Sequence, residues 1–133
     1  MNEAPRSYQT LAVEHRDGID WLTLYRPEQF NALNGAMMDE LLDYFGGLYF
    51  NHRVRVVVLR GAGKHFCAGL DLNETASFTS GIVAGARGQR RVAEIILRMR
   101  RCPQPIVALV QGAATGAGLA FALASDVRYA AEG

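Results

Sequence analysis

The sequence has few cysteines and no excess of either charge. Its two cysteines, Cys67 and Cys102, are too few for a disulfide framework, and their spacing does not fit a zinc site. The three histidines have no metal-ligand spacing with acids or cysteines, so we predict no metal site. The 14 Lys and Arg against 13 Asp and Glu leave a net charge of +1, which provides no global field to attract nucleic acid. A reducing, cytoplasmic compartment fits this composition best.

We also expect no signal peptide in the N-terminal residues of this sequence. Residues 1–16 are polar and of mixed charge, without the apolar core of a signal peptide. The uncharged segment 102–125 is 24 residues long and contains a GxxxG spacing, so its length would allow a membrane helix. Two prolines at its start, two glutamines and several glycines favour a buried strand over 105–110, then a glycine loop and a helix. A small membrane protein is therefore the minor alternative.

Length and hydrophobic patterning indicate one α/β unit. The 133 residues suit a single domain, and 50% hydrophobic with 20% charged residues exclude disorder, collagen and coiled coil. The expected strands are 11–16, 19–25, 56–59, 105–110 and 126–131, and the expected helices are 36–49, 82–101 and 116–125. Asp17-Gly18 predicts a hairpin turn and Asn34 a helix N-cap. Strands that alternate with helices predict a largely parallel sheet.

Two of the expected helices have distinctive side chains. The helix over 82–101 should bury Val83, Ala86, Val92 or Ala93, Ile96 and Met99. Its six arginines are expected on a solvated face, with a partner or ligand phosphate as the alternative. The helix over 116–125 consists of small and apolar residues and is expected to be hidden on nearly all sides.

Two familiar phosphate-binding motifs fail in this sequence. Gly61-Ala-Gly63-Lys64 follows an expected strand, as a phosphate loop would. A Walker A loop needs glycine where Val58 stands, and a dinucleotide fingerprint from Gly61 needs glycine or alanine where Phe66 stands. Neither motif is therefore present.

Two glycine-containing loops remain, and each directly follows a buried strand. They are Gly63–Leu72 and Val110–Leu119, the second of which opens a helix. Parallel sheets bind ligands where strands end in loops and helix N-termini. Backbone N–H groups from the two loops could converge on one oxygen and form an oxyanion hole. The alternative is that these glycines only allow close packing of helix and strand.

The motifs in their order resemble the crotonase superfamily, the enoyl-CoA hydratase/isomerase family. The segments that carry the resemblance are Leu24-Tyr-Arg-Pro27 with Asn31-Ala-Leu-Asn34, Val56 to Gly61 with Phe66-Cys-Ala-Gly-Leu-Asp-Leu72, Pro105-Ile-Val-Ala with Gln111-Gly112 and Gly116-Ala-Gly118, and Ser125-Asp126-Val-Arg-Tyr-Ala130. The resemblance implies repeated ββα units coiled into a spiral. Residues 1–133 would be its incomplete N-terminal core. We expect a C-terminal helical part beyond Gly133, which in the family completes the acyl pocket and forms a homotrimer or hexamer.

The resemblance further implies a coenzyme A thioester as substrate, with no tightly bound cofactor. The backbone N–H groups of Leu70 and Ala117 would form the oxyanion hole and stabilise an enolate during double-bond hydration, a lyase reaction, or isomerisation in fatty acid metabolism. The residues implied in CoA or substrate binding are Phe30, Asn31, Ala32, Ala68, Gly69, Leu70, Asp71, Leu72, Asn73, Gly116 and Ala117. Residues 76–86 would form part of the acyl pocket.

The sequence departs from the family pattern at the proton-transferring acid. Family hydratases have glutamate two residues after the last glycine of the second motif, where this chain has Ala120, and their second glutamate would fall beyond Gly133. Asp71, Glu74 and His65 are the local alternatives as bases. A non-catalytic CoA-binding or assembly subunit is the alternative function. We expect the 133-residue chain by itself to bind CoA poorly and to have no turnover.

Overall fold

The structure is a computed structural model that describes residues 7–71 and 81–132. One sheet contains β1 (Leu11–Arg16), β2 (Ile19–Leu24), β3 (Val56–Gly61), β4 (Ile106–Val110) and β5 (Val127–Ala130). The helical elements are η1 (Pro27–Gln29), α1 (Gly35–Leu48), α3 (Gly81–Arg101) and α4 (Ala117–Ala124). Each predicted strand and helix therefore has a counterpart, with ends that differ by one or two residues.

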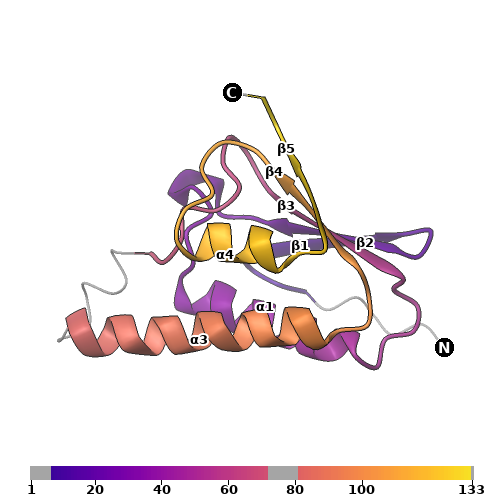
Figure 1. The fold of residues 1–133 in the computed structure, drawn as a ribbon, viewed down its shortest axis with the longest axis horizontal. Helices are drawn as coiled ribbons and strands as arrows, with labels where there is room; N and C mark the ends of the chain where they lie inside the picture. The colour runs from indigo at the N-terminus through magenta and orange to yellow at the C-terminus, as the bar shows by residue number, and fades with distance from the viewer. Residues whose placement is uncertain (1–6, 72–80, 133) are drawn as a thin grey trace.

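The sheet is mostly parallel, as predicted. Its strands follow the chain order β1-β2-β3-β4-β5, with β1 antiparallel to β2 and every later pair parallel. The β1–β2 turn has positive φ at both central residues, 54° at Asp17 and 80° at Gly18. This backbone matches the right-handed twist of paired strands, which is why Asp-Gly favours such a hairpin. The remaining strands are joined by crossovers that contain α1, α3 and α4 (Figure 1).

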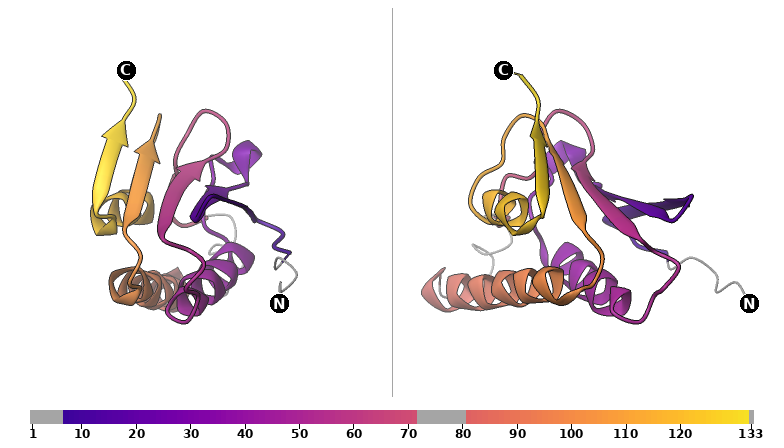
Figure 2. Two further views of the ribbon diagram at one scale, coloured as in Figure 1. Left: turned by 90° about the vertical axis from the view of Figure 1, so that its right-hand side faces the viewer. Right: turned by 45° about the vertical axis from the view of Figure 1, so that its right-hand side comes forward.

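The helices gather on one side of the sheet. Each crossover moves one strand along the sheet, and right-handed crossovers then place successive helices on the same face. α1 and α3 lie side by side, and α4 lies beside β4 and β5 (Figure 2). The core is between these helices and the covered face of the sheet, where Leu22, Leu24, Val57, Leu59 and Ile106 are buried.

Both ends of α1 are held by amide side chains. The Asn34 side chain accepts a hydrogen bond from Met37 N at 2.9 Å, which confirms the predicted N-cap. At the other end, Gln104 Nε2 donates to the carbonyls of Leu48 at 2.8 Å and Asn51 at 3.1 Å. These bonds satisfy backbone groups that a helix terminus leaves without intrahelical partners.

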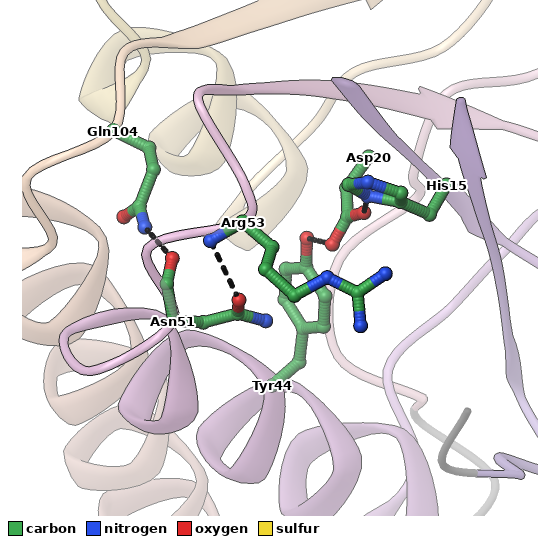
Figure 3. A network of polar contacts seen from close by, with 6 residues as sticks. All are labelled: His15, Asp20, Tyr44, Asn51, Arg53 and Gln104. Carbon is green, nitrogen blue, oxygen red and sulfur yellow. Dashed lines mark hydrogen bonds and ion pairs between the residues drawn. The ribbon is translucent and has the colours of Figure 1, made fainter. Parts of the chain in front are cut away.

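A buried carboxylate joins the β1–β2 hairpin to α1 (Figure 3). Asp20 on β2 is 5% exposed. Its Oδ1 lies 2.7 Å from His15 Nδ1, and its Oδ2 accepts a hydrogen bond from the Tyr44 hydroxyl at 2.7 Å. Burial, together with the bond to Asp20, raises the pKa of Tyr44. Because a buried charge is tolerated only when it is paired, these contacts fix α1 against the hairpin. Residue spacing in the sequence did not predict this network.

The buried face of α3 differs from the prediction. Val92, Ile95 and Met99 are buried, whereas Ala86 and Ala93 are exposed and Ile96 is half-buried. The packing partners explain the shift. A Cβ added to Gly88 would lie 3.2 Å from Leu70 Cδ1, so the helix turns its 88-92-95-99 face toward the core. Val83 lies outside the described side chains.

Two of the α3 arginines, Arg91 and Arg98, make hydrogen bonds to α1. Arg91 donates to the Gly35 carbonyl at 3.2 Å and pairs with Asp39. Arg98 donates to the Leu42 carbonyl at 2.7 Å and pairs with Glu94 at 3.1 Å. The predicted solvated face holds for the four exposed arginines, Arg87, Arg90, Arg100 and Arg101. Arg91 and Arg98 are half-buried because α1 packs close enough for its backbone carbonyls to accept their N–H groups.

The segment 102–125 divides into β4, a loop and the eight-residue α4, as predicted. Within residues 7–71 and 81–132, the helices are too short or too polar to cross a membrane. α4 is less enclosed than expected, since Leu119 is 48% and Leu123 is 61% exposed. Its Phe121, Ala122 and Ala124 side chains face the core, and the described chain leaves the opposite side of the helix uncovered.

Candidate active site

The loop after β3 and the loop after β4 lie against each other beyond the carboxyl ends of these strands. Phe66 N donates to the Gln111 carbonyl at 2.8 Å, and Cys67 N donates to the Ala113 carbonyl at 3.1 Å. In return, Thr115 N donates to the Cys67 carbonyl at 3.1 Å. The two segments therefore run as a short parallel ladder, and the structure brings together the two loops that the sequence singled out.

Glycine allows this close approach at two positions. Gly69 has φ of +92°, and a Cβ there would lie 3.0 Å from the Thr115 carbonyl oxygen and 3.6 Å from Ala117 N. A Cβ on Gly118 would lie 2.2 Å from the Cys67 carbonyl oxygen, where no side chain fits. The packing role that the sequence analysis kept as an alternative for these glycines is thus present.

The backbone N–H groups of Leu70 and Ala117 lie on these joined loops. Leu33 N donates to the Gly69 carbonyl and Asp71 N to the Leu33 carbonyl, so the Leu70 N–H points away from Leu33. Ala117 is the first residue of α4, where N–H groups lack intrahelical acceptors. Within the described part of the chain, neither N–H donates to a protein acceptor.

The segment after η1 forms a third wall beside the first loop. Ala68 N donates to the Phe30 carbonyl at 3.0 Å, and the Phe30 side chain is 57% exposed. Asn31 is fully buried, and its Nδ2 donates to the carbonyls of Ala62 at 2.9 Å and His65 at 2.8 Å. The Asn31 side chain thus braces the loop, and Phe30 contacts it through its backbone carbonyl. The CoA-binding role that the resemblance implied for Phe30, Asn31 and Ala32 stays a prediction.

An ion pair fixes the end of the first loop. Asp71 Oδ2 lies 3.1 Å from Arg26 Nη2, and the Asp71 side chain is 10% exposed. A carboxylate held by a guanidinium in this way favours a structural role over proton transfer. Leu72, Asn73, Glu74 and most of residues 76–86, which the sequence analysis assigned to the site or pocket, lie outside the described residues and side chains.

Cys67 lies inside the loop pair without a chemical role. Burial raises the pKa of its thiol to about 11, although a backbone hydrogen bond from Gly69 works in the opposite direction. The thiol is fully buried and stays protonated at neutral pH, so it is not an activated nucleophile.

Ala120, where the resemblance places the first hydratase acid, carries only a methyl group. Ala120 is half-buried on α4, where its N–H donates to the Gly116 carbonyl at 3.1 Å. An alanine cannot transfer a proton or orient a water molecule. Over the described residues, His, Cys, Asp and Glu do not form a group of three or more that could hold a metal ion.

Sequence reasoning missed the polar side chains that join the loops. Gln111 Nε2 donates to the Gly61 carbonyl at 2.7 Å, and Thr115 Oγ1 donates to the Ala68 carbonyl at 3.0 Å. His65 Nδ1 accepts a hydrogen bond from Ala113 N at 2.9 Å. The sequence signal that could have identified these residues is that each is a hydrogen-bonding side chain isolated among glycines and alanines.

Solved structures with the same arrangement define the class of this protein. The chain superposes on an enoyl-CoA hydratase of Mycobacterium smegmatis with a TM-score of 0.86 and 37% identity, covering 92% of this chain and 48% of that one. A putative enoyl-CoA hydratase from Streptomyces coelicolor gives 0.85 and 34%, covering 98% and 48%. The chain therefore has the crotonase fold.

Sequence relatives and a family model make the assignment specific. The model for enoyl-CoA hydratase/isomerase matches residues 14–133. A probable enoyl-CoA hydratase of Mycobacterium leprae is 39% identical over 120 residues, which cover 86% of this chain and 41% of that protein. A peroxisomal Delta(3,5)-Delta(2,4)-dienoyl-CoA isomerase of Arabidopsis thaliana is 32% identical over 95% of this chain and 50% of that protein. The chain belongs to the enoyl-CoA hydratase/isomerase family. It spans about half the length of the curated relatives it matches.

Proposed function

We propose that this chain binds an acyl-CoA thioester with the thioester oxygen between the N–H groups of Leu70 and Ala117. The observation that carries the proposal is that both N–H groups lie on joined loops without a protein acceptor in the described residues. Donors held in place before reaction stabilise charge that develops on a carbonyl oxygen. The positive end of the α4 dipole adds to this stabilisation at Ala117.

The reaction class follows from the anion that such a site stabilises. A thioester enolate is common to double-bond hydration and isomerisation, and the matched relatives include proteins named for each. Phe30, Ala32 and Ala68 are the described side chains that we place beside the CoA group, and Gly69 and Gly116 leave its approach open. No tightly bound cofactor is proposed. A cytoplasmic trimer or hexamer active in fatty acid metabolism stays a prediction.

Ala120 supports a second candidate, a non-catalytic subunit that binds CoA or takes part in assembly. The proton in either reaction needs a carrier, and Ala120 cannot be one. The two candidates differ in turnover and agree in thioester binding. An acid contributed from outside the described residues would favour the enzyme.

The first test measures recognition of the thioester oxygen. Acetoacetyl-CoA forms an enolate with its own near-ultraviolet absorption, and binding should increase the enolate fraction. Ala117→Pro removes one N–H donor, and proline is tolerated at the first position of a helix. We expect this variant to lose about 1.5–3 kcal/mol of enolate stabilisation, the usual contribution of a hydrogen bond to a charged group.

Ala117→Ser is the matched control, because it changes the same side chain and keeps the N–H. The proposal predicts an unchanged enolate signal with Ala117→Ser and a reduced one with Ala117→Pro. At chain concentrations that do perturb the acetoacetyl-CoA spectrum, equal signals from these two variants would overturn the proposed site.

A further inference from the structure

We propose that His65 is a positioning residue that holds the two site loops in register, and that it does so only in its neutral form. The inference rests on the proposed function, because the register matters when Leu70 and Ala117 share one ligand oxygen. It goes beyond that function by assigning a role to a side chain that does not itself contact the thioester oxygen.

Three segments of the site meet at His65. Its Nδ1 accepts the Ala113 N–H at 2.9 Å, which joins the loop after β3 to the loop after β4. Its backbone carbonyl accepts Asn31 Nδ2 at 2.8 Å. Its ring lies edge-on to Phe30, with ring centroids 5.0 Å apart and an angle of 89° between the planes. One residue therefore connects all three walls of the site.

The second loop is packed closely over this histidine. A Cβ on Gly112 would lie 2.2 Å from the Lys64 carbonyl oxygen and 2.6 Å from His65 Nδ1. Ala113, which His65 holds, begins the short segment that leads to Ala117 at the start of α4. A shift at Ala113 would therefore be passed directly to the Ala117 N–H.

The hydrogen bond depends on the protonation state of His65. An acceptor at Nδ1 requires the neutral tautomer with its proton on Nε2. The imidazolium carries N–H groups at both nitrogens, so its Nδ1–H would face the Ala113 N–H and the bond would break. This arrangement also argues against His65 as the general base, since Nδ1 is already occupied and Nε2 carries the proton.

The neighbouring charges are few. Residues 111–117 contain no titratable side chain, and Lys64 precedes His65 on its own loop. On the segment before Phe30, Arg26 is paired with Asp71 at 3.1 Å, and Glu28 lies on η1. The Ala113 contact joins a backbone N–H to the His65 ring, and of these two groups only the ring can be protonated. We therefore expect acid to break this hydrogen bond by protonating His65.

The test follows the Ala113 amide by NMR on the full 133-residue chain. Amide hydrogen exchange, normalised for intrinsic rate, is measured at a series of decreasing pH values, and ring nitrogen shifts report the tautomer and protonation state of His65. We expect the Nε2–H tautomer near neutral pH and about a tenfold loss of Ala113 protection when His65 is protonated, as for one hydrogen bond. His65→Asn places an acceptor oxygen near the Nδ1 position and does not titrate, so its protection should stay high at each pH. His65→Leu should lack the protection throughout.

His52→Asn serves as the control, because His52 is exposed on the loop after α1 and should leave the wild-type profile unchanged. The same variants are then mixed with acetoacetyl-CoA. We expect enolate stabilisation to fall with acid in the wild type, to be independent of this titration in His65→Asn, and to be reduced in His65→Leu.

Two results would overturn the inference. One is Ala113 protection in His65→Leu that equals the wild type at neutral pH. The other is a wild-type enolate signal that His65→Leu reproduces at each pH. If the Ala113 contact titrates as expected but no variant perturbs acetoacetyl-CoA, the loop contact is supported and the proposed function fails.

Discussion

Buried polar residues decide how the segments of this protein are joined. Asn31 is fully buried, yet its side chain reaches the carbonyls of Ala62 and His65 and accepts the Arg26 N–H at 2.8 Å. Each buried group without a partner would cost about 1–3 kcal/mol, so Asn31 satisfies several such groups at once. At this scale the resemblance was informative about location, because it placed Asn31 at the site, but not about which way its side chain faces.

Tyr44→Phe tests the buried carboxylate of Asp20. The substitution removes the donor at 2.7 Å and leaves His15 as the side-chain partner in Figure 3. We expect the free energy of unfolding at neutral pH to fall by about 1–3 kcal/mol, because the buried Asp20 oxygen loses its hydrogen bond. Urea denaturation measures the change. Tyr49→Phe is the control, because Tyr49 is 56% exposed.

The difference in free energy of unfolding between wild type and Tyr44→Phe should depend on pH in the alkaline range. Burial, then the hydrogen bond to Asp20, raise the pKa of Tyr44 above its unfolded value of about 10. The corresponding stability is fully present below pH 10 and is lost as the pH rises toward the folded-state value. The difference between wild type and Tyr44→Phe should therefore narrow above pH 10. A difference that stays constant from neutral to alkaline pH would contradict the assignment.

At the scale of elements, the helix ends are better specified by sequence than the helix faces. Asn34 could be identified as an N-cap because capping depends on residues within one turn. The buried face of α3 could not, because Ile95 and Ile96 are both apolar and only the position of the neighbouring helix selects Ile95. Arg91 and Arg98 illustrate the same point, since their acceptors are on α1, more than 50 residues away.

Asn34→Ala tests the start of α1. Loss of the hydrogen bond to Met37 N should lower the free energy of unfolding by about 0.5–2 kcal/mol, the usual range for an N-cap. Asn34→Ser keeps a capping oxygen and should retain most of the stability. Thermal and urea unfolding would measure both variants, and an equal loss in the two would mean that the cap is not the source of the effect.

At the scale of the whole molecule, the described chain joins the loop after β3 to the loop after β4, but the helix that follows lacks the acid expected from the resemblance. Leu119 and Leu123 on α4 are exposed, and Ala120 stands at the position where family hydratases have glutamate. We therefore expect the purified 133-residue chain to show no hydration of crotonyl-CoA. A monomer that turns over at an ordinary enzyme rate, about 1–1000 per second, would refute this expectation. The intact mass of the protein purified from its native cell would show whether the cell uses this 133-residue chain or a longer protein.

The sequence by itself determined the elements, their order and the family. Period-two and period-three-to-four patterns, the Asp17-Gly18 turn and the Asn34 cap act between near neighbours in the chain, so they are readable without a structure. The fold class was predictable for the same reason, since alternating strands and helices admit few arrangements.

Only the tertiary structure decided which side chains join the site together. His65 contacts Ala113 across 48 residues, and Asn31 contacts the His65 carbonyl across 34 residues. Such contacts depend on the pairing of β3 with both β2 and β4, which brings the ends of distant strands to one edge of the sheet. Local patterns contain no information on that approach, because its geometry is set by packing between elements rather than by spacing along the chain.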